Sequence, residues 1–380
     1  MIKRTLQELC LNITDGKHGD CENEENSGYY FISCKDIFDG QINYKNARQI
    51  TKADFEETHK RTMLEVDDIL LTNSGTIGRM AFVTDREATT KTTFQKSVAI
   101  IKPDKQKVLP RYLYYQLQNC VPQFINSSNG SAQKNLLLST MRTFQIEIEE
   151  NREKQEKIAN TLSAYDDLIE NNQKQIKLLE EAAQRLYKEW FVDLRFPGHE
   201  NTKIVDGVPE GWSRTNINEI LTFHRGYDLT KNEMKAGRYP VVGSTTVIGY
   251  HNEFKIKGPG IVTGRSGSLG KYQFIWDNFW PHNTSLYISD YKDHNIFFVY
   301  SLLQTVDFAS LNNGGAIPTL NRNVLSNIEV IEPTDELQEM FATITEAQYR
   351  KIRNLEKQND RLKTARDLLL PKFMSGEVEV

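Results

Sequence analysis

Two short turns carry the residue types closest to a chemical motif. Residues 74–79 read Ser-Gly-Thr-Ile-Gly-Arg, and residues 264–271 read Gly-Arg-Ser-Gly-Ser-Leu-Gly-Lys. The second segment suggests a phosphate-binding loop, but its spacing fails. Arg265 stands where that loop has its first glycine, and Tyr272 stands where a Ser or Thr would ligate magnesium. We therefore interpret both segments as tight glycine turns between strands, which bring cations such as Lys271 close to another surface.

No catalytic motif accompanies these turns. The seven histidines show neither the H-x-x-x-H nor the H-x-E spacing of metal sites. The sequence also lacks a Gly-x-Ser-x-Gly nucleophile elbow. It has no Asn/Asp-Pro-Pro-Tyr segment of the kind with which amino-methyltransferases hold a flipped base. A fused methyltransferase is therefore disfavoured, and we expect no catalytic residue and no metal ligand in this chain.

Polar loops offer chemistry of another kind. Residues 91–97 and 281–285 each precede a predicted strand, and residues 126–131 and 312–315 form a second matched pair. Their Asn, Gln, Ser, Thr, Arg and His side chains are the types that hydrogen-bond to the edges of DNA bases. Polar loops are more often simple connections, but their duplication favours a binding role. The candidate DNA-contacting residues are Ser74, Thr76, Arg79, Thr93, Gln95, Lys96, Asn129, Lys134, Arg225, Arg265, Ser266, Ser268, Lys271, His282, Asn283 and Asn313.

The elements that must position these loops also occur twice. Gly130 and Leu136 recur at a constant offset as Gly314 and Leu320, and each half ends in a long amphipathic segment. Two copies with so long a period indicate a duplicated globular domain and not a solenoid. Apolar runs broken by Gly, Asn and Asp predict strands and one short helix in each half. The strands are expected at 66–71, 80–83, 97–101, 260–263, 272–276 and 285–288, and the helices at 111–118 and 296–305.

The two amphipathic segments have the apolar spacing of a coiled coil. Steps of four and three residues continue without a break from Ile158 to Trp190 and from Phe341 to Phe373. Each predicted helix is roughly 50 Å long at 1.5 Å per residue. A helix of this length is too long to bury its whole apolar face against the globular domain of its own half. The central seam positions are Ile169, Asn172, Ile176, Leu179, Ile352, Leu355, Asn359 and Leu362.

One asparagine in each seam decides the orientation of the helices. In a parallel arrangement Asn172 would face Leu355, and an unpaired buried amide costs on the order of 1–3 kcal/mol. In an antiparallel arrangement Asn172 faces Asn359, and the two amides satisfy each other. The same register places Ile169 opposite Leu362, Leu179 opposite Ile352 and Trp190 opposite Phe341. We predict an antiparallel pair with a pseudo-two-fold axis.

Composition limits the class of protein. The chain has 380 residues, of which 38% are hydrophobic, so it holds enough apolar sequence for two cores. No apolar run is long enough to span a bilayer, and the N-terminal residues do not resemble a signal peptide. The four cysteines show no C-x-x-C spacing, which favours reduced thiols and a cytoplasmic location. A net charge of −4 argues against binding nucleic acid by bulk electrostatics but allows a locally basic surface.

These features together resemble the specificity subunit of type I restriction-modification enzymes. The glycine turn and the Asn-Gly-x-Ala segment of each half contribute to the resemblance. The most specific matches are three segments that close or open the domains. They are residues 185–197 (Arg-Leu-Tyr-Lys-Glu-Trp-Phe-Val-Asp-Leu-Arg-Phe-Pro), 208–212 (Val-Pro-Glu-Gly-Trp) and 370–376 (Leu-Pro-Lys-Phe-Met-Ser-Gly). The resemblance covers essentially the whole chain.

The resemblance implies an α+β fold with two β-rich target recognition domains, separated by two long antiparallel coiled-coil helices in a pseudo-two-fold repeat. The domains would span 1–150 and 201–333, and the spacer helices 151–200 and 334–380. Each domain would read half of a split, asymmetric sequence in double-stranded DNA. The spacer would dock two methyltransferase subunits, and nuclease-translocase subunits would complete the complex. S-adenosylmethionine, ATP and magnesium would belong to those partners, and this chain would bind no cofactor and no membrane.

Two other readings stay open at this stage. A duplicated scaffold could bind protein partners without DNA, and an orphan specificity protein could modulate another system.

Overall fold

The chain divides into two compact units. The computed structural model describes residues 1–84, 87–128, 134–265, 270–306 and 328–379. Unit 1 comprises Met1–Glu170 and Asn359–Val380, and unit 2 comprises Asn171–Gln358. Each unit therefore contains one β-rich domain and part of each long helix.

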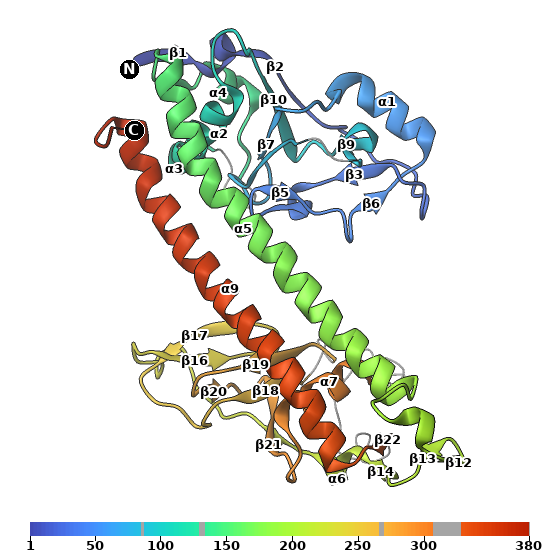
Figure 1. Ribbon diagram of the computed structural model, residues 1–380. Coiled ribbons are helices and arrows are strands. Elements are labelled where there is room, and N and C mark those ends of the chain that lie inside the picture. The colour runs from blue at the N-terminus through green and yellow to red at the C-terminus, as the bar shows by residue number, and fades with distance from the viewer. Residues whose placement is uncertain (85–86, 129–133, 266–269, 307–327, 380) are drawn as a thin grey trace. The chain divides into compact units, whose positions relative to one another are not determined.

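Unit 1 is built around a four-stranded antiparallel sheet with the order β2-β10-β7-β8. Figure 1 labels three of these strands, β2, β10 and β7. The strands are β2 (Cys10–Asp15), β10 (Val98–Pro103), β7 (Ile69–Thr72) and β8 (Met80–Phe82). All four residues of β7 are buried, because this strand pairs on both sides and has packed side chains on both faces. This sheet divides two clusters of apolar side chains, one containing Ile69 and Leu71 and the other Leu70.

A second sheet and several short elements complete this domain. Strand β3 pairs with β6 in antiparallel and with β9 in parallel orientation. The remaining strand pairs are β1 with β11 and β4 with β5. The bounds are β1 (Ile2–Thr5), β3 (Tyr30–Ile32), β4 (Ile37–Phe38), β5 (Gln41–Ile42), β6 (Arg48–Gln49), β9 (Thr92–Phe94), β11 (Gln145–Ile148), α1 (Lys52–Thr62), α2 (Pro110–Asn119), α3 (Val121–Asn126) and α4 (Leu138–Thr143).

Unit 2 repeats this topology. Its central sheet has the order β15-β21-β18-β19, and β16 pairs with β17 in antiparallel and with β20 in parallel orientation. The strand pair β14–β22 corresponds to β1–β11 of unit 1. The bounds are β12 (Ile204–Val205), β13 (Val208–Pro209), β14 (Ser213–Asn216), β15 (Thr222–Arg225), β16 (Tyr239–Val242), β17 (Val247–His251), β18 (Gly260–Gly264), β19 (Tyr272–Ile275), β20 (Trp280–Pro281), β21 (Ser285–Asp290), β22 (Glu329–Glu332), α6 (Ile217–Ile220) and α7 (Ile296–Thr305). The duplicated α+β organisation expected from the sequence is confirmed.

The predicted strands and short helices of both halves are present, with one shift. The strand expected at 66–71 begins at Ile69. Asp67 adopts a positive φ of 77°, and the Asp68 carboxylate accepts a hydrogen bond from the Glu65 amide at 2.8 Å. These residues therefore form a turn before the strand.

Helix α1 is one of the differences between the two domains. Helix α1 lies between β6 and β7 in unit 1. The corresponding connection in unit 2, residues 252–259 between β17 and β18, contains no helix. The first domain thus carries an addition to the shared framework.

The long helices are α5 (Arg152–Tyr187), continued by a π-helical turn (Lys188–Val192), and α9 (Asp335–Ser375). In unit 1, Ile158 and Leu162 of α5 share a core with Phe373 and the partly buried Leu369 of α9. Later in α5, Asp166 pairs with Arg366, which precedes Leu369 and Phe373 in α9, so the pairing in this unit is antiparallel.

Unit 2 shows the same orientation. Leu179 packs into one cluster with Ile352, and the rings of Trp190 and Phe341 lie 6.0 Å apart. The predicted antiparallel pairing and these two register pairs are confirmed. Asn172 and Asn359 are 2% and 6% exposed, but they belong to different units, and their pairing stays a prediction from the sequence.

The segments that close the first long helix build an aromatic core in unit 2. Phe191 packs against Phe341 with ring centroids 5.2 Å apart, and Phe196 packs against Trp212 at 4.8 Å. The end of α5, the start of α9 and the opening of the second domain are therefore joined by ring contacts.

None of the described helices is both long enough and apolar enough to cross a membrane. All four cysteines are free thiols, and three of them are buried.

Candidate nucleic-acid interface

Three loops of unit 1 meet at one edge of the central sheet. Asp15, at the end of β2, pairs with Ala99 near the start of β10, and Val98 pairs with Thr72 at the end of β7. Because neighbouring strands are antiparallel, the loops after β2, before β10 and after β7 leave the sheet on the same side. Two segments singled out in the sequence, 74–79 and 91–97, therefore converge.

The glycine turn after β7 is held by a threonine. The Thr72 hydroxyl donates to the carbonyl of Thr76 and accepts a hydrogen bond from the Arg79 amide at 2.9 Å. Gly78 has a φ of 94°, and a side chain there would lie 2.5 Å from Val121, so only glycine fits. In unit 2 the Thr263 hydroxyl donates to the Lys271 carbonyl at 3.0 Å. The predicted turns between strands are thus the β7–β8 and β18–β19 connections.

A close backbone approach marks the same edge in both units. Lys17 forms an isolated parallel bridge with Gln95, and Tyr227 forms one with His282. A Cβ atom on Gly16 would lie 1.9 Å from the carbonyl oxygen of Phe94, and one on Gly226 would lie 2.1 Å from that of His282. The two edges are therefore equivalent by topology.

A polar cleft opens at this edge in unit 1. Its volume is about 660 Å³. The lining residues are Asp15, His18, Arg61, Asn73, Ser74, Lys96, Asn135, Leu136, Leu137, Leu138 and Ser139. Ser74 forms an antiparallel bridge with Asn135, which joins the glycine turn to the segment 135–139 that also lines the cleft. The cleft combines two cations with amide, hydroxyl and carboxylate groups.

The buried carboxylate of Asp15 organises one side of the cleft. It is 6% exposed, accepts a hydrogen bond from an Nη2 proton of Arg61, and lies 2.9 Å from Nε2 of His18. Arg61 reaches this position from the last turn of α1, where Phe55, Thr58 and Thr62 form the buried face of the helix. The addition specific to the first domain thus delivers a cation to the cleft.

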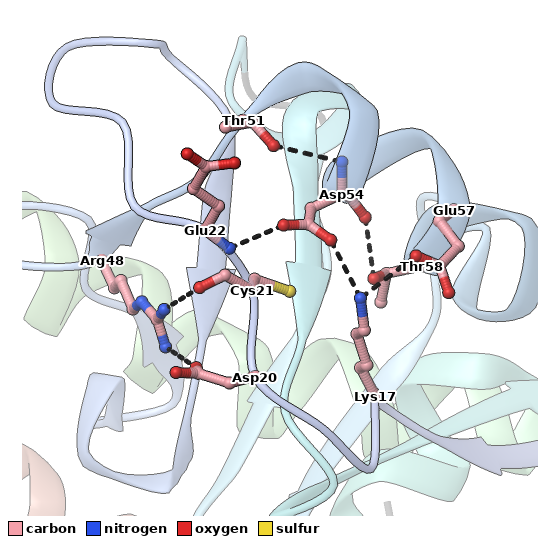
Figure 2. Close-up of polar contacts among 9 residues, drawn as sticks. All are labelled: Lys17, Asp20, Cys21, Glu22, Arg48, Thr51, Asp54, Glu57 and Thr58. Atoms are coloured by element: carbon pink, nitrogen blue, oxygen red, sulfur yellow. Dashed lines mark hydrogen bonds and ion pairs between the residues drawn. The ribbon is translucent and has the colours of Figure 1, made fainter.

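A hydrogen-bond network fixes α1 against the loop that follows β2 (Figure 2). Lys17 Nζ donates to Asp54 at 2.9 Å and to Glu57 at 3.1 Å, and the Glu22 amide donates to Asp54 at 2.6 Å. The hydrogen bonds from the Glu22 amide and from Lys17 lower the pKa of Asp54. The loop bearing His18 and the helix bearing Arg61 are therefore anchored to each other.

The predicted residues of the first half occupy different environments. Ser74 and Lys96 line the cleft, and Gln95 lies beside Lys96 at the parallel bridge. Thr76, Arg79 and Lys134 are exposed but do not line it. The interpretation of Thr93 as a contact residue is wrong. It is fully buried, and its hydroxyl lies 3.2 Å from that of Thr62, so it belongs to the core.

The predicted residues of the second half gather at the equivalent edge. Arg225 ends β15 and lies 3.6 Å from Asp228, to which Asn283 also donates a hydrogen bond. The Arg265 amide donates to the Thr284 carbonyl at 3.2 Å. The ring nitrogens of His282 lie 3.0 Å from Thr284 Oγ1 and 3.2 Å from the Leu229 carbonyl, so this side chain stabilises the loop. Lys271 is exposed beyond the glycine turn.

Four predicted residues, Asn129, Ser266, Ser268 and Asn313, lie outside the described residues.

Sequence reasoning missed Asp15, His18, Arg61 and Asn73. A weak signal was present for Arg61, because the spacing of Phe55, Thr58 and Thr62 indicates an amphipathic helix ending in basic residues. Within the described residues, no group of three or more His, Cys, Asp or Glu side chains is suited to hold a metal ion.

This duplicated fold defines a class of proteins. The structure of a type I restriction-modification system S subunit from M. genitalium matches it with a TM-score of 0.60 at 18% identity, covering 98% of this chain and 95% of that chain. The fold is therefore that of specificity subunits.

Sequence comparison shows the family. The chain is 27% identical over 384 residues to the type I restriction enzyme MjaIX specificity subunit of Methanocaldococcus jannaschii, covering 92% of this chain and 87% of the relative. It is 28% identical over 173 residues to the type I restriction enzyme EcoBI specificity subunit of Escherichia coli, covering 44% of this chain and 35% of that subunit. Residues 3–181 and 209–364 match the type I restriction modification DNA specificity domain. The chain belongs to this family.

Proposed function

We propose that this chain reads a bipartite, asymmetric sequence in double-stranded DNA as the specificity subunit of a type I restriction-modification complex. The domains 1–150 and 201–333 each read one half-sequence, and the segments 151–200 and 334–380 form the spacer. Family membership and the duplicated fold support this assignment.

The observation that carries the asymmetry is a difference in chemistry at equivalent positions. The parallel bridges align Gln95 with His282, and Lys96 with Asn283. The strand ends align Asp15 with Arg225, one residue before the tightly packed glycines Gly16 and Gly226. Two edges with the same backbone and different donors and acceptors suit two different base sequences.

The local charge fits DNA despite the net charge of −4. Arg61, Lys96 and Arg79 lie on the loops or α1 at this edge in unit 1, and Arg225, Arg265 and Lys271 lie at its counterpart in unit 2. Acidic residues elsewhere in the chain offset these cations in the sum, while the phosphate backbone meets the local surface.

The remaining subunits would supply the chemistry. Two adenine methyltransferase subunits dock on the spacer and bring S-adenosylmethionine, and nuclease-translocase subunits bring ATP and magnesium. The complex works in the cytoplasm. The chain alone neither methylates nor cleaves DNA.

A domain exchange in the complete methyltransferase complex tests this function. Methylated adenines are mapped for the native chain and for a chimera in which residues 201–333 come from a relative with another target. One half-sequence should change and the other should persist. A single continuous palindrome, or a change in both half-sequences, would overturn the bipartite assignment. Absence of sequence-specific methylation would favour a scaffold or an orphan modulator.

A further inference from the structure

Arg61 is fixed in position by two partners. Its Nε lies 3.3 Å from Thr14 Oγ1, and Nη2 donates to the Asp15 carboxylate. Asp15 is 6% exposed, whereas the Arg61 side chain is 50% exposed. A buried carboxylate therefore holds one edge of a guanidinium whose other end faces the cleft and solvent.

The remaining donors of Arg61 are available in a fixed geometry. A guanidinium carries five N–H groups in a planar fork, and the two contacts use the Nε proton and one Nη2 proton. The two Nη1 protons and the second Nη2 proton have no partner among the described residues. These protons form the end of the fork that binds two acceptors at once.

The same cleft contains an acceptor without a donor. Asn73 is 4% exposed, and its Oδ1 has no hydrogen-bond partner in the described part of the chain. A buried amide oxygen left without a donor is unfavourable, so its retention at a cleft indicates that a ligand supplies one. Donors at Arg61 and an acceptor at Asn73 complement the major-groove edge of a G·C pair. That edge presents guanine O6 and N7 as acceptors and cytosine N4 as a donor.

The ion pair with Asp15 favours a base over a phosphate as the partner of Arg61. Asp15 offsets the charge of the guanidinium, which weakens its attraction to the phosphate backbone but preserves its bidentate geometry. Lys96 lines the same cleft as a compact cation and has no ion pair in the described structure, so it is better suited to a phosphate.

We infer that Arg61 reads a guanine in the half-sequence recognised by the first domain. This inference rests on the proposed function. Asp15 is the positioning residue that orients Arg61. The second domain lacks a counterpart of α1 in residues 252–259, so this guanine contact belongs to one half-sequence only.

The substitution Arg61→Lys tests this inference, because it keeps the charge and removes the fork. The variant is assembled with its methyltransferase partners, and methylation rates are measured on duplexes carrying each base at each position of the native site. We expect a roughly 10- to 100-fold loss of discrimination at one guanine of the first half-sequence. Discrimination in the second half-sequence should be unchanged, which also reports that the complex has assembled.

Two further variants complete the design. Asp15→Asn should relax the same guanine position to a smaller extent, because the fork stays but is less firmly oriented. It also provides a second test if Arg61→Lys assembles poorly. Lys60→Ala, at the exposed neighbour on α1, should leave both half-sequences unchanged.

The outcomes separate the inference from the function on which it rests. If Arg61→Lys weakened methylation of all sequences equally and left discrimination at every position unchanged, Arg61 would not read a guanine and the inference would fail. If it changed neither discrimination nor affinity, the inference would also fail. A native complex without a bipartite site would instead overturn the proposed function.

Discussion

Arg366 of α9 donates a hydrogen bond to Asp166 of α5 across 2.5 Å, although 200 residues separate them in the chain. The second carboxylate oxygen of Asp166 accepts a hydrogen bond from the Tyr115 hydroxyl at 2.6 Å. This carboxylate therefore joins both long helices to α2 of the first domain within unit 1. The side chains of Asp166 and Arg366 are only 21% and 22% exposed, so solvent screens the pair incompletely.

Asp166→Asn should destabilise unit 1 by about 1.5–3 kcal/mol, because it removes the charge that both hydrogen bonds use. Urea unfolding followed by circular dichroism gives the free energy of unfolding. Asp367 also pairs with Arg366, but its side chain is 62% exposed, so Asp367→Asn serves as the control and should cost less than about 1 kcal/mol. Equal losses in the two variants would contradict the importance of the buried partner.

Trp190→Ala should destabilise unit 2 by about 3–5 kcal/mol, because it leaves a cavity beside Phe341 and Phe191. Thermal unfolding of the full chain reports the loss. The matched control is Val192→Ala in the same π-helical turn, where the side chain is 55% exposed and the effect should stay within about 0.5 kcal/mol. A small effect at Trp190 would show that the aromatic core does not hold the end of α5.

Gly16→Ala and Gly226→Ala should each separate a strand end from the loop beside it, because the added methyl group would overlap a carbonyl oxygen. We expect a loss of about 1–3 kcal/mol in each case. In methylation assays, each variant should impair recognition of its own half-sequence more than the other. Gly19→Ala is the control, since the nearest atom to its Cβ would be Lys17 Cε at 3.9 Å. If recognition were unchanged in both glycine variants, the assignment of this sheet edge as the DNA-contacting surface would be wrong.

Acid should loosen the loop 17–22. The pKa of Asp54 is lower in the folded protein than in the unfolded chain, so its ionised form stabilises the fold at neutral pH. This contribution is complete above the usual Asp pKa of about 3.9 and is lost as the pH falls through the lower folded value. Hydrogen exchange at the Glu22 amide should therefore accelerate, after correction for intrinsic rates, when the protein is taken below pH 4. Asp54→Asn should show fast exchange already at neutral pH, whereas Glu57→Gln, at a 70% exposed position, should behave like the native chain. Exchange that ignored both pH and Asp54 would contradict the network.

The framework was predictable because its signals repeat along the sequence. The seam from Ile158 to Trp190 shows its period in the spacing of its apolar residues, and the packing of Leu179 against the cluster that contains Ile352 follows from the same register. The glycine turns were predictable as turns, since Thr72 and Gly78 are needed for local hydrogen bonds and a positive φ.

The cleft was not predictable in the same way. Arg61 and Asp15 lie 46 residues apart, and no periodic pattern links a helix end to a strand end. Thr93 misled the prediction because its type suits a base contact, yet β9 is buried and Thr62 satisfies its hydroxyl. The local sequence does not show whether a polar side chain is buried and hydrogen-bonded to a distant residue, so this outcome could not be predicted for Thr93.

The division of the chain into units has a consequence for its synthesis. Unit 2 is one continuous segment, but unit 1 needs residues 359–380, which are translated after the whole of unit 2. Until then the nascent first domain lacks Phe373 and Met374, which pack into the same core as Leu6 and Ile148, and it exposes the apolar surface that they cover. Translation of the intervening chain takes on the order of ten seconds or more at about 5–20 residues per second, during which chaperones have access to that surface. The domain of unit 1 is therefore translated before that of unit 2, but it can complete its core only afterwards.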